Sequence, residues 1–350
     1  MADIEYTDEV ERVKAALGGA TAATGGTFLP VETSQEIIRI VYEQNYLRGL
    51  ISAIPQGRQT LKIPKLTGSV SFHEISLTAV EAGTEPAEST QATAEITLEL
   101  KTIIANVPIG NYLVSYGVEG LLQVLRDDIG SRLAYVEENL ILNGDTTITT
   151  AYADNRNGAY NASTNPKGVN ATNNDYLLLF GGLLESASAT VVDAGNAVFA
   201  LSQLRSAITN LGVYANNRDE LALVVPRLVE TQLLGFTELQ TLDKYGPNAT
   251  ILTGEIGRIY GIRVFGTNTL RDDLNATGVY DGTTTDRTIA LLFNHRSPLI
   301  GNPTKTERRF NIGFKDDPTK DRFILIPRED ISFGIRYTDA LCVIYNLAKS

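Results

Sequence analysis

One long stretch, residues 115–144, constrains the fold of this chain more than any other. Its apolar residues recur in steps of three and four, the spacing that lines one face of an α-helix. They are Val118, Leu121, Leu122, Leu125, Ile129, Leu133, Val136 and Leu140. We expect the charged residues on the opposite face, namely Glu119, Arg126, Asp127, Asp128, Arg132, Glu137 and Glu138. At about 1.5 Å per residue the helix would be roughly 40 Å long, so another part of the molecule must lie along it.

The two ends of this helix carry their own signals. Ser115 is expected to cap the first turn, and Asn143 followed by Gly144 predicts a left-handed stop. Gly120 and Gly130 argue against a plain coiled coil, and the stretch is too polar to span a bilayer.

Length, charge and cysteine content set the class of protein. The chain has 350 residues, which favours about two or three domains with ample material for a core. A formal net charge of -11 argues against an overall nucleic-acid binder, because phosphate binding requires clustered Lys and Arg. Cys342 is the one cysteine, so no disulfide can form within the chain. No basic segment followed by an apolar run opens the sequence, so we expect neither a signal peptide nor a membrane span.

The N-terminal part has the features of an arm. An amphipathic helix is expected near residues 8–17, and a Gly/Ala/Thr-rich linker follows it. A second helix is expected to begin after Thr33 and Ser34. The short strand at residues 62–66 is expected to be cut off by its own proline, Pro64.

Between residues 69 and 108 the apolar pattern changes to period two, which is typical of β-strands. We predict a long hairpin with arms at residues 69–77 and 93–109 and a flexible, acidic tip. The acidic residues of this tip are Glu81, Glu85 and Glu88. A two-stranded hairpin is only marginally stable alone in water, so we expect it to lie on a partner, for which another chain is a candidate.

The rest of the chain mixes helices with strands, which indicates an α+β domain. Residues 145–175 are expected to form an exposed loop. We expect helices within 196–213 and 227–236, strands at 221–226 and 287–294, and a strand or hairpin at 257–267. Residues 313–323 are predicted to be a turn that joins two strands, with Pro318 at its centre.

Residues that could carry catalysis or bind a metal are sparse. His73 and His295 have no second nitrogen or sulfur ligand near them in the sequence, whereas a zinc site needs three or four ligands. The chain has neither a nucleophile elbow nor a phosphate-binding loop, and Asp127 and Asp128 fit a solvated helix face better than a site. We therefore expect no enzyme activity, no cofactor and no metal.

A basic stretch near the C-terminal end carries Lys305, Arg308 and Arg309. It has no interleaved aromatic residues for base stacking, so a salt-bridged protein contact is favoured over nucleic acid. Our hypothesis is that the acidic hairpin tip of one copy lies over this stretch of a neighbouring copy.

These segments occur in a characteristic order. GGTFLPVETSQEIIRIVYEQNYLRGLI is followed by the strand IPKL, the acidic-tipped hairpin and a long helix that ends in EENLILNGD. VVPRLVETQLLGF, GRIYGIRVFGTNTL and REDISFGIR come downstream. Over residues 25–347 this order resembles the major capsid proteins of tailed double-stranded DNA bacteriophages with the HK97-type fold.

The resemblance implies an α+β capsid fold in four parts. They are an N-terminal arm (1–60), an extended β-hairpin loop (61–105), a peripheral domain (106–173 and 294–335) with a spine helix at 115–143, and an axial domain (174–293 and 336–350). It also implies hexamers and pentamers in an icosahedral shell around double-stranded DNA, which is enclosed without sequence-specific binding. The shell would be assembled in the bacterial host cytoplasm, with a portal and a decoration protein as candidate partners. Gly120 and Gly130 would let the spine helix bend as the shell expands.

Two departures from this family change the expectation. Some members join subunits by an isopeptide bond from a lysine on the extended loop, but no residue between Leu66 and Leu100 is lysine. Lys101 stands at the base of the arm, so we expect a non-covalent shell. Some relatives begin with a long scaffolding segment, whereas only a short segment precedes Phe28 here. We therefore expect a separate scaffolding protein.

Other functions stay open at this point. An encapsulin-like compartment would use the same fold to store an enzyme instead of a genome. A virion decoration or receptor-binding protein would suit the Asn/Thr-rich loops and the β-rich tail, and it would form trimers instead of shells. An enzyme is the least favoured alternative, because the sequence offers no convergent polar site.

Overall fold

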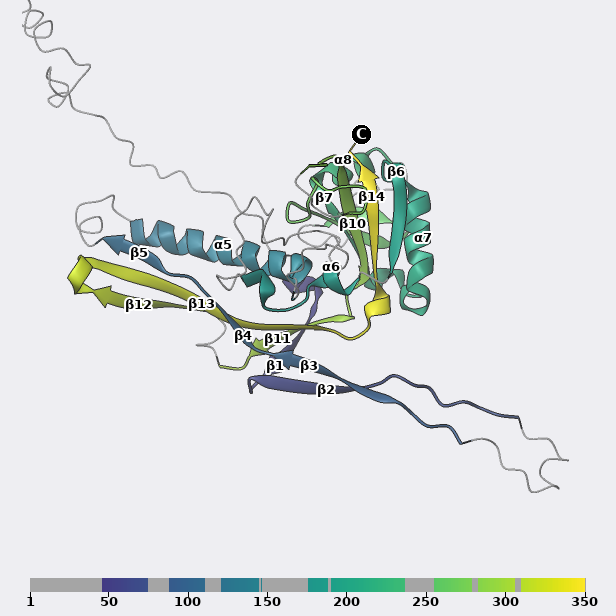
Figure 1. The fold of residues 1–350 in the computed structure, drawn as a ribbon, viewed down its shortest axis with the longest axis horizontal. Coiled ribbons are helices and arrows are strands. Elements are labelled where there is room, and N and C mark those ends of the chain that lie inside the picture. Colours follow the sequence, from purple (N-terminus) through teal and green to yellow (C-terminus); the bar gives the residue numbers. More distant parts are fainter. Residues whose placement is uncertain are drawn as a thin grey trace, which may run out of the picture.

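The computed structural model describes residues 46–74, 88–110, 121–144, 146, 176–187, 190–236, 255–278, 283–305 and 310–349. These residues form two six-stranded sheets and a two-stranded hairpin (Figure 1). Several predictions fall outside the described residues: both N-terminal helices up to residue 45, the outermost hairpin tip, the first residues of the long helix and the loop at 147–175.

One sheet, called here the compact sheet, has the strand order β6-β14-β10-β7-β9-β8. Its strands are β6 (Val191–Ala197), β7 (Leu221–Pro226), β8 (Glu255–Ile259), β9 (Ile262–Thr267), β10 (Arg287–Asn294) and β14 (Leu341–Ala348). The predicted strands 221–226 and 287–294 are confirmed as β7 and β10, both almost wholly buried. The predicted strand or hairpin at 257–267 is confirmed as β8 and β9.

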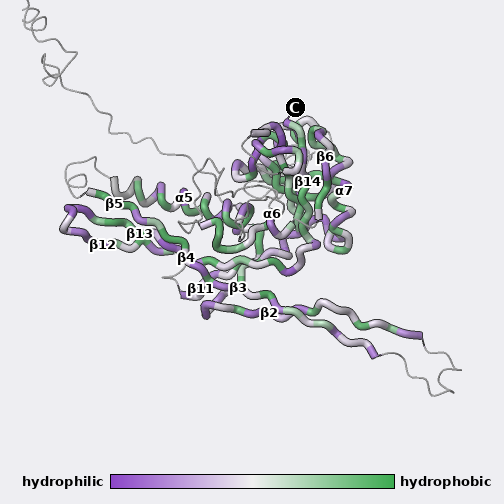
Figure 2. Tube along the Cα trace, viewed as in Figure 1, coloured by the Kyte–Doolittle hydropathy of each residue, from purple (hydrophilic) through white to green (hydrophobic). Residues whose placement is uncertain are grey.

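Hydrophobic cores cover both faces of the compact sheet. Helices α7 (Leu201–Leu211) and α8 (Arg227–Leu234), both expected from the sequence, pack on one face through residues such as Leu204 and Val229. The other face packs against α2 (Leu47–Leu50), α6 (Leu183–Ser186) and the end of the long helix. Figure 2 shows hydrophobic segments in this part of the molecule and also along α5 and β5.

The second sheet, called the elongated sheet, has the path β1-β11-β13-β12, with β4 and β5 also paired to β13. Its strands are β1 (Ser52–Gln56), β4 (Lys101–Ile104), β5 (Val107–Gly110), β11 (Pro298–Pro303), β12 (Asn311–Asp317) and β13 (Arg322–Ile335). The predicted turn at Pro318 is confirmed, because the short η7 (Pro318–Lys320) joins β12 to β13. The other short 3-10 helices are η4 (Tyr176–Leu178), η5 (Gly212–Ala215), η6 (Arg218–Glu220) and η8 (Thr338–Ala340).

The hairpin differs from its prediction in register. Its paired strands are β2 (Thr60–Leu66) and β3 (Thr93–Glu99), and residues 69–74 are not part of a strand. Pro64 does not cut off β2, because it pairs with Glu95 inside the strand. Since β2 is an edge strand, a proline whose missing N–H would face solvent is tolerated there. The period-two pattern of the second arm continues past β3 into β4 and β5, which belong to the elongated sheet.

Part of the range assigned to the N-terminal arm belongs to the core. Leu47, Leu50 and Ile51 are buried, and β1 pairs in parallel with β11. Residues 47–56 are therefore built into the body of the molecule. This correction follows from the apolar pattern of LRGLI, which a projecting arm would expose to water.

The long helix is present as α5 (Leu121–Asn143) and lies along β5, β12 and β13 (Figure 1). No helix of the described residues has both the length and the apolar content needed to cross a bilayer. The C-terminal end of α5 differs from the predicted left-handed stop, because Gly144 has no positive φ. Gly144 instead allows a close backbone contact, in which the Gly182 N–H donates to the Gly144 carbonyl at 2.7 Å.

This contact predicts that position 182 tolerates no side chain. A Cβ on Gly182 would lie 2.7 Å from the Gly144 nitrogen and 2.8 Å from the Leu142 carbonyl oxygen, both backbone atoms. Gly182→Ala should therefore lower the free energy of unfolding by about 3 kcal/mol, as overpacking does. Calorimetric melting measures this loss. The control is Gly130→Ala, where a Cβ meets no atom within 4 Å and helix propensity should add about 1 kcal/mol. Equal melting temperatures for the two variants would contradict the close contact.

Candidate assembly surfaces

The hairpin of β2 and β3 projects from the body of the molecule (Figure 1). It presents exposed apolar side chains to solvent, with Phe72 94% and Leu66 60% exposed. Glu88 is exposed as well, while Glu81 and Glu85 lie outside the described residues. No Lys or Arg stands between Leu66 and Leu100, so the outer hairpin is acidic. Their exposure on a projecting element makes the hairpin a candidate contact surface.

The root of the hairpin is fixed to the elongated sheet. The Gln56 side chain donates to the Leu98 carbonyl at 3.1 Å and accepts a hydrogen bond from the Ser332 hydroxyl at 2.8 Å. Leu98 is fully buried, and a side chain at Gly334 would collide with it. Gly334 therefore allows β3 to cross closely over β13.

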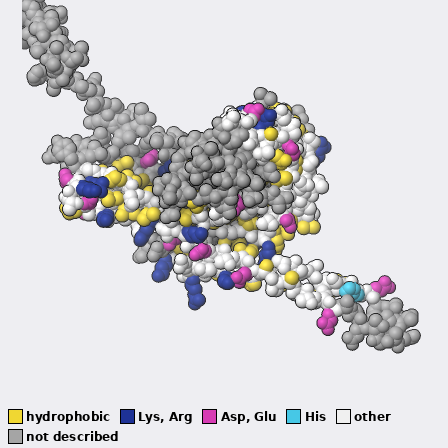
Figure 3. Space-filling view, in the orientation of Figure 1, with side chains coloured by type: hydrophobic (Ala, Val, Ile, Leu, Met, Phe, Trp, Pro, Cys, Tyr) yellow, Lys and Arg dark blue, Asp and Glu magenta, His cyan; other side chains and the backbone are white. Residues whose placement is uncertain are grey.

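A basic surface lies close to this root. Lys305 is exposed and lines an open hollow of about 340 Å³ together with Arg58, Thr102 and Asp330. Arg308 and Arg309 lie outside the described residues. Figure 3 shows Lys and Arg side chains along this lower edge of the body and acidic side chains toward the outer end of the hairpin. The hollow adds Arg58, which the sequence analysis missed because it stands alone in its segment.

A buried ionic cluster joins α5 to the elongated sheet. Arg48 donates to Glu137 on α5 at 2.6 Å, to Glu329 on β13 at 2.9 Å and to Asn302 on β11 at 2.9 Å. Both glutamates are only 4% exposed. Burial and the negative charge of Glu137 raise the pKa of Glu329 to about 7, against the opposing effect of the hydrogen bond from Arg48.

This cluster corrects the prediction for the charged face of the long helix. Glu137 and Glu138, expected in solvent, are 4% and 0% exposed. The Glu138 carboxylate accepts a hydrogen bond from the Thr267 hydroxyl of β9 at 2.9 Å. The spacing contains the signal that was missed, because Glu137 stands four residues after Leu133 and four before Ile141. Glu329 likewise occupies an inward position of β13, two residues from Pro327 and Ile331.

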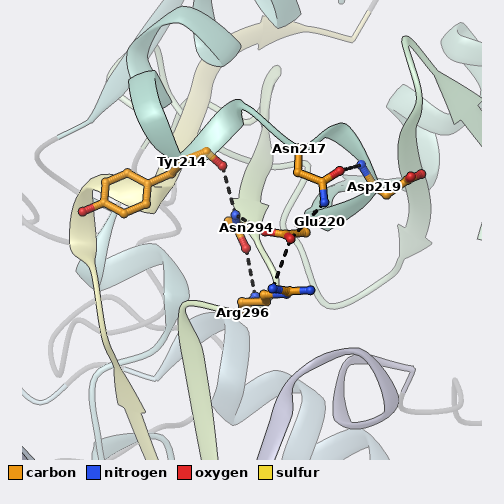
Figure 4. A network of polar contacts seen from close by, with 6 residues as sticks. All are labelled: Tyr214, Asn217, Asp219, Glu220, Asn294 and Arg296. Atoms are coloured by element: carbon orange, nitrogen blue, oxygen red, sulfur yellow. Dashed lines mark hydrogen bonds and ion pairs between the residues drawn. The ribbon is translucent and has the colours of Figure 1, made fainter.

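The two sheets meet at a polar junction, shown in Figure 4. Asn294, at the end of β10, donates to the Tyr214 carbonyl at 2.9 Å and accepts from the Arg296 N–H at 3.0 Å. The Glu220 carboxylate pairs with Arg296 at 3.2 Å and accepts from Asn217 at 2.9 Å. Hydrogen bonding from Asn217 lowers the pKa of Glu220, and Asn294 and Arg296 lower it further. These contacts fix the start of the connection from β10 to β11.

The other candidate residues do not converge. His73 lies on the hairpin and His295 follows β10, and no group of His, Cys, Asp or Glu in the described residues could hold a metal ion. Burial lowers the pKa of His295, and Arg263 adds to this effect. Lys101 donates to the Leu179 carbonyl within the same chain. Gly130 lies within α5, and Gly120 is outside the described residues.

The buried glutamate predicts a pH dependence of stability. Glu329 keeps its proton up to about pH 7 in the folded chain, whereas its ordinary pKa is 4.5. The folded chain therefore binds more protons between these values, and the contribution of Glu329 to the free energy of unfolding falls as pH rises through this window. Glu329→Gln should remove this fall, which is on the order of 3 kcal/mol, in urea unfolding between about pH 5 and pH 8.

The control for this measurement is Glu95→Gln, which removes an exposed carboxylate paired with Lys62 at 2.6 Å. It should leave the pH dependence as it is in the original chain. The explanation is wrong if Glu329→Gln and the original chain lose stability in parallel as pH rises.

Comparison with known proteins identifies the family. The Phage capsid family matches residues 25–285, which is most of the chain. The chain therefore belongs to the phage capsid family, a family of structural proteins. No curated protein sequence matches it significantly.

Solved structures agree with this assignment at the level of the fold. A chain of Microbacterium phage Oxtober96 is 14% identical with a TM-score of 0.57, and the match covers 93% of this chain and 98% of that chain. A capsid chain of a native GTA particle computed with C5 symmetry is 15% identical with a TM-score of 0.59, over 95% of this chain and 100% of that one. A chain of Gordonia phage Cozz is 16% identical with a TM-score of 0.57, over 94% and 96%.

The predicted HK97-like α+β fold and the predicted function as a major capsid protein are confirmed by these findings. The protein forms the shell of a virion by self-association. The encapsulin-like and decoration-protein alternatives receive no support.

Proposed function

We propose that this chain assembles into hexamers and pentamers, which close into a non-covalent icosahedral shell around double-stranded DNA. The observation that carries the proposal is the projecting hairpin, whose exposed Phe72 and Leu66 have no cover within the described part of the subunit. A neighbouring copy in a ring would supply that cover. In this arrangement the protein has a structural function and no catalytic one.

We infer that the compact sheet builds the axial domain and the elongated sheet with α5 builds the peripheral domain. The hairpin is the extended loop, and the segment before residue 46 is the arm. Assembly takes place in the host cytoplasm with a separate scaffolding protein, a portal and a decoration protein. With a net charge of -11, the shell wall would bind the phosphates of DNA only weakly, so the DNA could move along it.

The hairpin is proposed to dock by charge. Its acidic residues Glu81, Glu85 and Glu88 would lie over the stretch with Lys305, Arg308 and Arg309 of a neighbouring copy. The exposed positions of Glu88 and Lys305 support this contact, and Arg58 beside Lys305 adds a further positive charge. Charges at such a rim guide docking and register more than they add affinity.

Electron microscopy of the purified protein tests both proposals. The original chain, expressed with its scaffolding protein, should form shells that dissociate into monomers in hot SDS. The double variant Arg308→Glu with Arg309→Glu should give few or misdirected shells, because like charges then face the hairpin tip. The control is Arg205→Glu with Arg218→Glu, an equal charge change at exposed positions of the compact sheet unit. Trimers or monomers from the original chain would contradict the shell, and normal shells from the first variant would contradict the docking contact.

Gly120 and Gly130 are proposed to let α5 bend when the shell expands. The structure offers support at Gly130, where no neighbouring atom lies close enough to require a glycine. Gly130→Ala should therefore fold normally and block expansion, since the alanine stiffens the helix. Particle diameters before and after maturation measure the effect. Ser131→Ala is the matched control, because it raises helix propensity at the adjacent position and keeps Gly130. Normal expansion of the Gly130→Ala shell would refute the bend.

A further inference from the structure

Two of the chain connections between the compact and elongated sheets are hydrogen-bonded to each other. One joins β10 to β11 and the other joins β13 to β14. The Arg336 N–H donates to the Ser297 carbonyl at 2.9 Å. The Ser297 hydroxyl donates to the Tyr337 carbonyl at 2.8 Å and accepts from the Tyr337 N–H at 3.1 Å. A change in the angle between the sheets would therefore act on this crossing point.

The hairpin reaches the same crossing point through Lys65. Its ammonium group donates to the Arg336 carbonyl at 2.8 Å and lies 5.5 Å from the centroid of the Tyr337 ring. The Tyr337 ring in turn lies 5.2 Å from the ring of Tyr214 in η5, which follows α7. Lys65 stands next to the last residue of β2, where the hairpin leaves the body. Because Lys65 is half-buried, its ammonium group is bound by these contacts and is not free in solvent.

We propose that Lys65 and Tyr337 form a latch that fixes the direction of the projecting hairpin relative to the compact sheet. A charge-assisted hydrogen bond and a cation–π contact are strong enough to favour one direction, and two such contacts can be broken without unfolding either sheet. The hairpin root at Gln56 and Leu98 holds β3, whereas the latch holds the outer end of β2. Hairpin direction and the angle between the sheets therefore change together.

The same hairpin contains a matched lysine that should have no such effect. Lys62 lies in β2 as well, but it pairs with Glu95 of β3 at 2.6 Å. Its ion pair lies within the hairpin, between β2 and β3. Lys62→Met and Lys65→Met thus remove the same charge and the same chemical group from one strand.

Pulsed electron paramagnetic resonance, which measures the distance between two spin labels, tests the latch in the full-length chain. Labels are placed at Ser69→Cys on the hairpin and Thr209→Cys on α7, both exposed positions, while the buried Cys342 stays unlabelled. Labelled chain is diluted with an excess of unlabelled chain, so that distances are measured within one subunit. Lys65→Met should make the distance distribution about twofold wider, because one end of β2 is released. Lys62→Met should leave it unchanged.

Tyr337 variants separate the ring contact from the backbone contact. Tyr337→Phe keeps the ring and should match the original chain. Tyr337→Ala removes the cation–π contact but keeps the hydrogen bond from Lys65 to the Arg336 carbonyl, so it should widen the distribution less than Lys65→Met does. Combining Lys65→Met with Tyr337→Ala should add little, because both remove one latch. Equal widths for Lys65→Met and Lys62→Met would overturn the latch. This readout is independent of assembly, so a failed latch and a failed shell proposal are distinguishable.

The latch also has a consequence that rests on the proposed shell. Identical chains in non-equivalent places of a shell need different hairpin directions. The latch limits the number of directions that the hairpin of one subunit can adopt. Lys65→Met subunits should still assemble but give a wider range of particle diameters than Lys62→Met subunits. Diameters as uniform as those of the control would contradict this consequence.

Discussion

The position of α5 against the rest of the molecule depends on Arg48. Its guanidinium group contacts α5, β13 and β11 at once, and it faces two buried carboxylates, Glu137 and Glu329. Desolvation makes such a cluster a weak source of net stability, but removing one partner leaves an uncompensated buried charge. The cluster therefore fixes the register of the helix more than it strengthens the fold.

This anchoring is concentrated at one end of α5. From Glu137 to Gly144 nearly every residue is buried, and the backbone contact with Gly182 closes that end. In the other half Ile129, Leu133 and Val136 are only half-buried, although they continue the apolar stripe. The helix is thus held firmly beside the compact sheet and less firmly toward Leu121. This asymmetry is consistent with the proposed bend at Gly130, which lies in the less buried half.

Local pattern was enough to predict most of the fold, and it failed where distant segments meet. The strands β7 and β10 followed from continuous apolar runs that end at Pro226 and Asn294, and α7 and α8 from their helical spacing. The burial of Glu137 and Glu329 was missed because each charge is explained only by Arg48, far away in the sequence. A left-handed conformation was predicted for Gly144, whereas its role is the close backbone contact with Gly182. The hairpin register was missed because the alternation at 69–77 looks the same as that of β2, and pairing with β3 decides between them.

The charge distribution of the hairpin gives the proposed ring contact a direction. Its outer part carries glutamates and no Lys or Arg, whereas Arg58, Lys62 and Lys65 stand at or near its root. A two-fold pairing with the hairpins parallel would place the acidic tips on one another. Head-to-tail packing instead places each acidic end on the basic root of the next copy. Such heterologous contacts close into rings, and the angle set at the hairpin root then decides how many copies complete each ring.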